Sequence, residues 1–339
     1  MRYKILINCL LLLVSTLLSC SKNESSSPEI FELKIPQGFP EMTFPSDNEF
    51  TVDRWILGKK LFYEKALSKN NSISCGSCHQ QSLAFTDGLA KARGVEMRLG
   101  ERNTPSLANV GYHPYLLREG SVSTLEKQIL VPIQEHAEFD FSMPEIIDRL
   151  GTSTTYRELA HKAYSRDLDA FVLTRSIATF ERSLISGNSE YDRIYTQGVL
   201  EPIDYKVALG KELFFSNKTN CRTCHSGFNF TNYSFQNNGL YLNYVDLGKQ
   251  RATGKTEDLA LFKVPSLRNI EYSAPYMHDG SINTLEEVVE HYNSGGKNHP
   301  QKSNLIQALG LTEEEKKHLV AFLKSLSDPN FLNDKNLSE

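Results

Sequence analysis

One motif, Cys-x-x-Cys-His, occurs twice in the chain, at residues 75–79 and 221–225. Two thiols at this spacing can add to the two vinyl groups of a haem, and the histidine that follows can bind the iron. A zinc site of four cysteines would need the two pairs to meet, and a thioredoxin-like site would need one pair, so neither explains a histidine after each pair. We therefore expect two c-type haems, with His79 and His225 as proximal iron ligands. The cysteines that would attach the haems are Cys75, Cys78, Cys221 and Cys224.

The sequence around the two motifs is repeated. Residues 57–63 read Leu-Gly-Lys-Lys-Leu-Phe-Tyr and return at 209–215 as Leu-Gly-Lys-Glu-Leu-Phe-Phe. Residues 120–126 read Gly-Ser-Val-Ser-Thr-Leu-Glu and return 160 positions later, at 280–286, as Gly-Ser-Ile-Asn-Thr-Leu-Glu. The chain therefore consists of two diverged copies of one haem-binding unit.

Each copy is predicted to be mostly helical, because no convincing alternation of strand residues is found. Residues 169–185 form a long helix candidate that could join the copies, and Gly and Pro place a boundary within 198–204. We expect an all-α protein with one haem domain at 49–200 and a second at 201–329. Four Ser/Thr-x-x-Glu patterns resemble capping boxes at helix starts. These patterns are Ser123–Glu126, Thr155–Glu158, Thr284–Glu287 and Thr312–Glu315.

The sixth iron position decides what each haem can do. Tyr292 corresponds to Pro132 at the offset of 160. A phenolate can bind iron and proline cannot, so the second haem would be closed and the first open to a small oxidant. Gln128 and Glu138 stand near the open position and could move a proton between peroxide oxygens. From spacing alone, a packing or surface tyrosine is the commoner explanation of Tyr292, and two solvated helix residues would also explain Gln128 and Glu138.

The first residues resemble an export signal. A positively charged start precedes the apolar stretch 5–18, and Leu-Leu-Ser-Cys at 17–20 resembles a bacterial lipobox. We expect residues 1–20 to be a lipoprotein signal peptide and Cys20 to anchor the protein to the periplasmic face of a membrane. An ordinary cleaved signal peptide is the alternative. Residues 21–48 would then form a tether and an N-terminal arm.

Composition excludes several classes of protein. The formal net charge is −4, from 37 Lys and Arg against 41 Asp and Glu, which excludes nucleic-acid binding by a broad basic surface. Six cysteines in 339 residues are too few for a disulfide scaffold. After the N-terminal stretch, no apolar run is long enough to span a bilayer.

Three further segments resemble the bacterial dihaem cytochrome c peroxidase family, including its MauG branch. They are 103–107 (Asn-Thr-Pro-Ser-Leu), 262–269 (Phe-Lys-Val-Pro-Ser-Leu-Arg-Asn) and 274–280 (Ala-Pro-Tyr-Met-His-Asp-Gly), and the similarity runs from about Trp55 to Leu326. The resemblance implies two tandem cytochrome c-like domains, each with one covalently bound haem. It implies that hydrogen peroxide is reduced at the N-terminal haem, with electrons that a cytochrome c or a cupredoxin delivers through the C-terminal haem. A homodimer is left open.

The resemblance also implies roles for single residues. Gln128, Pro132 and Glu138 match the distal pocket of the family. Tyr292 stands where ordinary members have a distal Met, as it does in the MauG branch. Oxygen donors at three further positions match those that hold a calcium ion between the domains. They are the side chain of Asn103 and the backbone carbonyls of Ser273 and Pro275.

Three features depart from the family. No histidine stands in 85–102, where many members have a distal ligand, so the first site should be open unless Met97 substitutes. Arg118 replaces the tryptophan that lies between the haems, which puts the usual electron path in doubt. An anionic Tyr292 would stabilise ferric iron, so the second haem should have a lower potential than a Met-ligated one. Met277 is the alternative donor there.

These observations leave three functions. The leading one is a lipid-tethered dihaem peroxidase. A MauG-like oxidase, which draws electrons from side chains of a partner protein, is favoured by Tyr292 and weakened by Arg118. A dihaem electron carrier without enzymatic activity would need two six-coordinate haems and would show no peroxide turnover.

Overall fold

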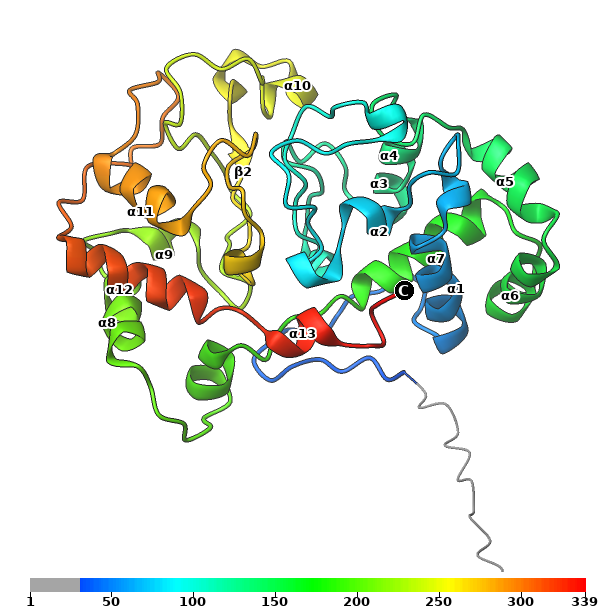
Figure 1. Ribbon diagram of the computed structural model, residues 1–339, viewed down its shortest axis with the longest axis horizontal. Coiled ribbons are helices and arrows are strands. Elements are labelled where there is room, and N and C mark those ends of the chain that lie inside the picture. The colour runs from blue at the N-terminus through cyan, green and yellow to red at the C-terminus, as the bar shows by residue number, and fades with distance from the viewer. Residues whose placement is uncertain (1–30) are drawn as a thin grey trace, which may run out of the picture. The chain divides into compact units, whose positions relative to one another are not determined.

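Helices are the main regular structure of the folded chain (Figure 1), which the computed structural model describes from residue 31 to residue 339. The expected signal peptide and Cys20 lie outside the described residues. The helices of the first copy are α1 (Val52–Phe62), α2 (Cys75–Cys78), α3 (Leu125–Gln128), α4 (Leu130–Gln134), α5 (Met143–Gly151), α6 (Thr154–Tyr164) and α7 (Ala170–Arg182). Those that follow are α8 (Tyr205–Phe215), α9 (Cys221–Cys224), α10 (Gln250–Thr253), α11 (Leu285–Ser294), α12 (Glu313–Lys324) and α13 (Pro329–Asn333).

The β-strands in the described part of the chain are short. Strands β1 (Phe235–Gln236) and β2 (Phe262–Lys263) pair antiparallel as a two-stranded sheet. The mostly helical class predicted from the sequence is therefore confirmed, and the small sheet is an addition that no alternating pattern indicated.

The same helix pair forms the core of each copy. Helix α1 packs against α7, and α8 packs against α12. A glycine allows each close approach, since a Cβ atom on Gly58 would lie 1.9 Å from Ser176 O and one on Gly210 would lie 1.9 Å from His318 O. The helix expected over 169–185 is thus α7, which belongs to the core of the first copy.

Hydrogen bonds repeat along with the helices. Asn109 N donates to Leu184 O at 2.7 Å, and Asn269 N donates to Leu326 O at 3.1 Å. The side-chain amides of both asparagines donate to Ser186, one to its carbonyl oxygen and the other to its hydroxyl. Because the asparagines are 160 positions apart, the repeat read from the sequence is confirmed as a repeat of the structure.

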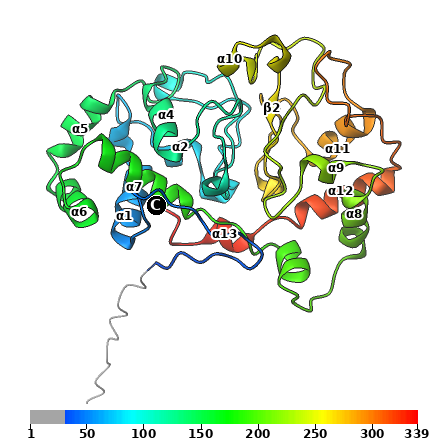
Figure 2. The same ribbon diagram turned by 180° about the vertical axis from the view of Figure 1, so that it is seen from behind.

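The end of the chain returns to the first copy. Figures 1 and 2 show α13 passing from α12 toward α1 and α7 in both views. Gln81 Nε2 donates to Phe331 O and to Asp334 O, each at 2.9 Å. Residues Glu32–Glu339 form one compact unit, and the domain boundary expected between the copies stays a prediction.

Helix starts confirm only part of the capping prediction. The boxes at the starts of α11 and α12 are present, with the N-cap threonine and the third-residue glutamate bonded to each other's backbone. The other two predictions are wrong, because α3 has Thr124 and not Ser123 as its N-cap, and α6 has Ser153 and not Thr155. Glu126 binds an arginine of α7 instead.

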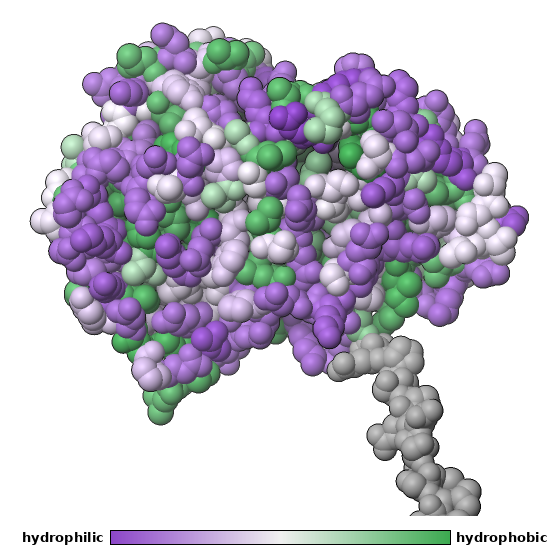
Figure 3. Space-filling model, in the orientation of Figure 1, coloured by the Kyte–Doolittle hydropathy of each residue, from purple (hydrophilic) through white to green (hydrophobic). Residues whose placement is uncertain are grey.

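The surface is mainly polar. Figure 3 shows hydrophilic residues over most of the visible face, with hydrophobic residues in small groups. Large apolar side chains of the second copy gather inside it around Phe214, Phe230 and Phe322.

Among residues 31–339, no helix has the length and apolar character needed to cross a membrane.

Candidate haem sites

The two motif histidines are held in the same way. His79 Nδ1 lies 2.8 Å from Phe85 O, and His225 Nδ1 lies 3.1 Å from Phe230 O. Because a carbonyl oxygen can only accept, each Nδ1 carries the proton and each Nε2 keeps a free lone pair. Burial lowers the pKa of both imidazoles, that of His225 to about 4. Both rings are therefore neutral and have the tautomer that iron binding requires.

The four motif cysteines are free thiols on the one-turn helices α2 and α9. Burial raises the pKa of each thiol, that of Cys78 to about 12. Within the described residues, no three His, Cys, Asp or Glu side chains are grouped so as to hold a metal ion. The two pairs therefore do not meet as the zinc alternative requires, and each pair with its histidine fits a covalently attached haem.

Glu138 lies beside the first attachment motif. After burial, its charge is among the causes that raise the pKa of both Cys75 and Cys78. Burial, and then Glu135, raises the pKa of Glu138 itself to about 7. Val95 N donates to Glu138 O at 2.9 Å and fixes the backbone there. A carboxyl with this pKa can take up and release a proton at neutral pH, as general acid–base catalysis requires.

The other predicted residues of the first site are Gln128 and Pro132. Gln128 ends α3, Pro132 lies within α4, and both are half-buried. Phe139 N donates to Pro132 O at 3.1 Å, so the turn that carries Pro132 is bonded to the residue after Glu138. Met97 is 65% exposed, which argues against its thioether as a substitute iron ligand.

Two candidate iron donors lie together at the second motif. Asn238 Nδ2 lies 3.3 Å from Met277 Sδ and 3.4 Å from Tyr292 Oη. Burial raises the pKa of Tyr292, and the charges of Cys221 and Cys224 act in the same direction, so the phenol lies near both cysteines. The phenol is therefore protonated in the chain alone, and a ferric iron would favour its phenolate form.

Comparison with known proteins agrees with this geometry. The sequence model of the family described as di-haem cytochrome c peroxidase matches residues 53–199 and 204–330. The chain belongs to the di-haem cytochrome c peroxidase family. The family accounts for both attachment motifs, and it assigns two c-type haems to the chain.

Relatives of this peroxidase-family chain cover most of its length. Methylamine utilization protein MauG of Methylorubrum extorquens is 34% identical over 89% of this chain and 86% of that protein. Cytochrome c551 peroxidase of Nitrosomonas europaea is 32% identical over 83% of this chain and 82% of that protein. A solved MauG-like protein associated with microbial copper homeostasis is 32% identical, with a TM-score of 0.86 over 91% of this chain and 99% of that one. The chain is thus an oxidoreductase of the MauG-like branch.

The two copies of this dihaem chain exchange a reciprocal pair of backbone hydrogen bonds. Asn103 N donates to His278 O at 2.9 Å, and Lys263 N donates to Arg118 O at 2.8 Å. Lys263 and His278 stand 160 positions after Asn103 and Arg118, so the two bonds are equivalent under the repeat. We call this meeting place of the copies, at Asn103, Arg118, Lys263 and His278, the junction.

The calcium site expected at the junction does not fit the side chains present. Arg118 Nη2 donates to Asn103 Oδ1 at 2.8 Å and to Asn103 O at 2.9 Å. Burial, and then the charge of Arg102, lowers the pKa of Arg118 to about 10, so the guanidinium stays charged at neutral pH. A divalent ion at these oxygens would be repelled by both arginines. Calcium at Asn103, Ser273 and Pro275 stays a prediction, and the Arg118 guanidinium that binds the oxygens of Asn103 argues against it.

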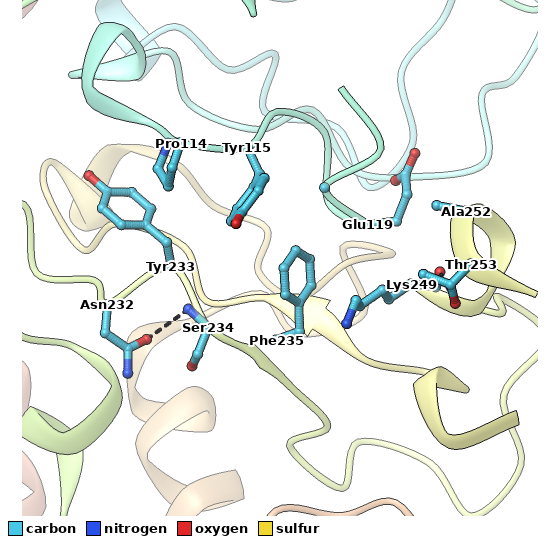
Figure 4. Close-up of a pocket in the computed structure, with 11 residues that line it drawn as sticks. Pro114, Tyr115, Glu119, Asn232, Tyr233, Ser234, Phe235, Lys249, Ala252 and Thr253 are labelled. Carbon is cyan, nitrogen blue, oxygen red and sulfur yellow. Dashed lines mark hydrogen bonds between the residues drawn. The ribbon is translucent and has the colours of Figure 1, made fainter. Parts of the chain in front are cut away.

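A cavity of about 580 Å³ has residues of both copies in its lining (Figure 4). The first copy contributes Tyr115 and Glu119, and the second contributes Tyr233, Phe235 and Lys249. The ring centroids of Tyr115 and Phe235 are 6.0 Å apart. The lining includes none of the motif cysteines and histidines, so this cavity is separate from the haem attachments.

Two features of the sites were not predicted. Asn238 belongs to no motif, and only the fold brings it to the two candidate donors of the second site. Arg118 was visible in the sequence as the loss of a tryptophan, but its contact with Asn103 was not. A search for charged replacements near an expected cation site could have found the second feature and not the first.

Proposed function

We propose that the protein reduces hydrogen peroxide to water at its first haem, with electrons that a small redox protein delivers through its second haem. The difference between the two sites carries this proposal. Glu138, whose pKa is about 7, acts electrostatically on both cysteines of the first motif, where Pro132 offers no donor to iron. Tyr292 lies near enough to both cysteines of the second motif for their charges to raise its pKa. An open site with a proton-transferring group suits an oxidant, and a closed site suits electron transfer.

The proposed chemistry needs a proton to move between two oxygens. The haem iron, when bound, supplies the centre that binds peroxide and passes electrons. Glu138, as a carboxylate, takes a proton from one peroxide oxygen and returns it to the other as the O–O bond breaks. The Gln128 amide donates a hydrogen bond that orients the peroxide. One peroxide, two electrons and two protons give two waters.

Peroxide consumption with reduced cytochrome c or reduced cupredoxin as the donor tests this proposal. Glu138→Gln should slow consumption by about 10²-fold, because a general acid–base group is lost. Glu158→Gln removes an exposed carboxyl of α6 and should keep the wild-type rate. A purely low-spin ferric spectrum together with no peroxide turnover would overturn the proposal in favour of an electron carrier.

A MauG-like oxidase is the second candidate. Tyr292 favours it, and relatives named methylamine utilization protein MauG are 34% and 32% identical to this chain. In this reaction the electrons would come from side chains of a partner protein, whereas Arg118 replaces the tryptophan that the MauG branch uses to share charge between its haems. This candidate would be favoured over the first if peroxide consumption needs a partner protein and leaves oxidised residues in that partner. Mass spectrometry would detect these residues.

We also propose that the protein is exported and anchored at the periplasmic face of a membrane through a lipid on Cys20. The lipobox-like end of the leader supports this placement. Cys20→Ala should lose lipid labelling and leave the membrane fraction. A wild-type protein found wholly in the periplasmic fluid would contradict the anchor.

A further inference from the structure

Glu181, in the last turn of α7, is a buried carboxyl that the proposed peroxide chemistry does not use. The residue is 5% exposed, and its Oε2 atom has no hydrogen-bond partner within residues 31–339. Burying a carboxyl without a partner is costly, and most buried polar atoms in proteins are hydrogen-bonded. An exception of this kind calls for a specific reason.

The second copy shows what packing alone requires at this position. In each copy a serine hydroxyl donates to the carbonyl oxygen three residues before it, at 2.6 Å for Ser183 and 2.7 Å for Ser325. These serines are 142 positions apart. The residues that the two helix-contact glycines approach, Ser176 and His318, are also 142 positions apart. At this offset Glu181 corresponds to Leu323, which is 7% exposed. An apolar side chain therefore fills the position in the second copy, and only the first copy has a carboxyl there.

The arginine next to Glu181 is bound to another carboxylate. Arg182 Nη1 donates to Glu126 Oε1 at 2.7 Å and Nη2 donates to Oε2 at 3.2 Å. Asn48 Nδ2 donates to the same Glu126 at 3.1 Å. Burial raises the pKa of Glu181 to about 8, with Arg182 opposing this shift and Glu126 adding to it. Glu181 thus holds a proton at neutral pH, while Arg182 is bound to Glu126.

Glu181 also lies near the first attachment motif. After burial, its charge is the largest cause of the raised pKa of the Cys75 thiol, ahead of Cys78 and Glu138. The charged and titratable groups that act on Glu181 are thus Arg182 of its own helix, Glu126 of α3 and Cys75 of α2. A haem bonded to Cys75 would share this buried, low-dielectric region, where a change of charge acts strongly on a neighbouring carboxyl.

We propose that Glu181 is a proton-holding residue of the first haem site, which keeps its proton while the iron is ferrous and releases it when the iron is oxidised. One electron leaves the iron for a redox partner or mediator, and one proton leaves the Glu181 carboxyl for solvent water, so the net charge of the buried site is preserved. The second site has Leu323 at this position and lacks the coupling. The inference rests on haem attachment at Cys75 and applies to a peroxidase and to an oxidase alike.

Midpoint potentials of both haems, measured by spectroelectrochemical titration of the holoprotein at several pH values, test this coupling. Glu138→Gln is the background, because Glu138 also titrates beside the first motif. In this background the potential of the first haem should fall as pH rises, because the reduced form binds the proton more tightly. The limit for one proton per electron is about 59 mV for a tenfold change in proton concentration.

Adding Glu181→Gln or Glu181→Leu should reduce the change of the first haem's midpoint potential with pH. The midpoint potential of the second haem should stay as it is without this variant. The reciprocal variant Leu323→Glu should give the second haem a pH dependence that the wild type lacks. A slope that survives Glu181→Leu would overturn the proposal. Infrared difference spectra of the wild type provide a check that needs no variant, because oxidation should remove the signal of a protonated carboxyl, and an unchanged signal would also overturn it.

Discussion

The guanidinium of Arg118 donates hydrogen bonds to both oxygens of Asn103, from Nη2 at 2.9 Å to the main-chain oxygen and at 2.8 Å to Oδ1. Asn103 in turn donates from its backbone nitrogen to His278 O in the other copy. The guanidinium of Arg118 therefore binds one of the three residues at which the resemblance placed a calcium ion. We accordingly expect that the junction between the copies does not depend on an ion that can dissociate.

Chelation should therefore leave the junction intact. Treatment with EDTA should change neither the melting temperature nor the haem spectra, whereas Arg118→Gln should lower the free energy of unfolding by about 1–3 kcal/mol, because the buried oxygens of Asn103 lose charged donors. Arg251→Gln is the control, since it removes an exposed ion pair with Glu101 and should cost less than about 1 kcal/mol. Metal analysis that finds one calcium ion per active chain would contradict the prediction.

The close contact between α1 and α7 leads us to predict that Gly58 cannot be enlarged without loss of stability. A Cβ atom on Gly58 would lie 1.9 Å from Ser176 O, so Gly58→Ala should lower the free energy of unfolding by about 3 kcal/mol or more. Gly151→Ala is the matched control, because a Cβ atom there meets nothing within 4 Å and should stabilise by about 0.4–1 kcal/mol. Urea unfolding measures both changes, and equal stability of the two variants would mean that the helices do not pack at Gly58.

Features that depend on local spacing could be predicted from the sequence, and those that depend on distant contacts could not. The sequence predicts the attachment motifs and the repeat, because each consists of a short run of consecutive residues. The capping box at Ser123 was wrong because Glu126 binds Arg182, 56 positions away along the chain. The calcium prediction rested on Asn103, Ser273 and Pro275, and only the fold shows that Arg118 reaches the oxygens of Asn103.

The pH dependence of the peroxide reaction follows from Glu138. Only the carboxylate can accept a proton, so the wild-type rate should rise with pH through about 7, the pKa of this carboxyl. Stopped-flow mixing of the oxidised protein with peroxide at several pH values measures this profile. Glu138→Gln should be about 10²-fold slower and should lose this rise. If the variant keeps the wild-type profile, another group titrates.

Ionisation of Glu138 should also lower the free energy of unfolding. Its pKa in the folded protein lies above the value of about 4.3 for an unfolded glutamate, so folding is penalised as pH rises above that value. The penalty grows up to the folded pKa and reaches at most about 4 kcal/mol. Glu138→Gln should therefore raise the melting temperature at about pH 8 and have little effect at about pH 4. A variant that is less stable at both pH values would contradict the burial cost.

Axial ligation at the second site is tested by Tyr292→Met. An anionic phenolate stabilises ferric iron more than a neutral thioether does, so this variant should raise the midpoint potential of the second haem by roughly 100 mV or more. Its low-spin absorption bands should shift, while the high-spin signal of the first haem stays as in the wild type. Spectroelectrochemistry and electron paramagnetic resonance measure the two changes.

Because Asn238 lies within 3.4 Å of both candidate donors, single variants are needed to separate them. If Tyr292 is the ligand, Tyr292→Phe should change the low-spin spectrum and Met277→Ala should leave it unchanged. Tyr272→Phe, at a tyrosine that is 39% exposed, controls for the loss of a phenol elsewhere. The opposite pattern, an effect of Met277→Ala and none of Tyr292→Phe, would make the thioether the ligand and the phenol its neighbour through Asn238.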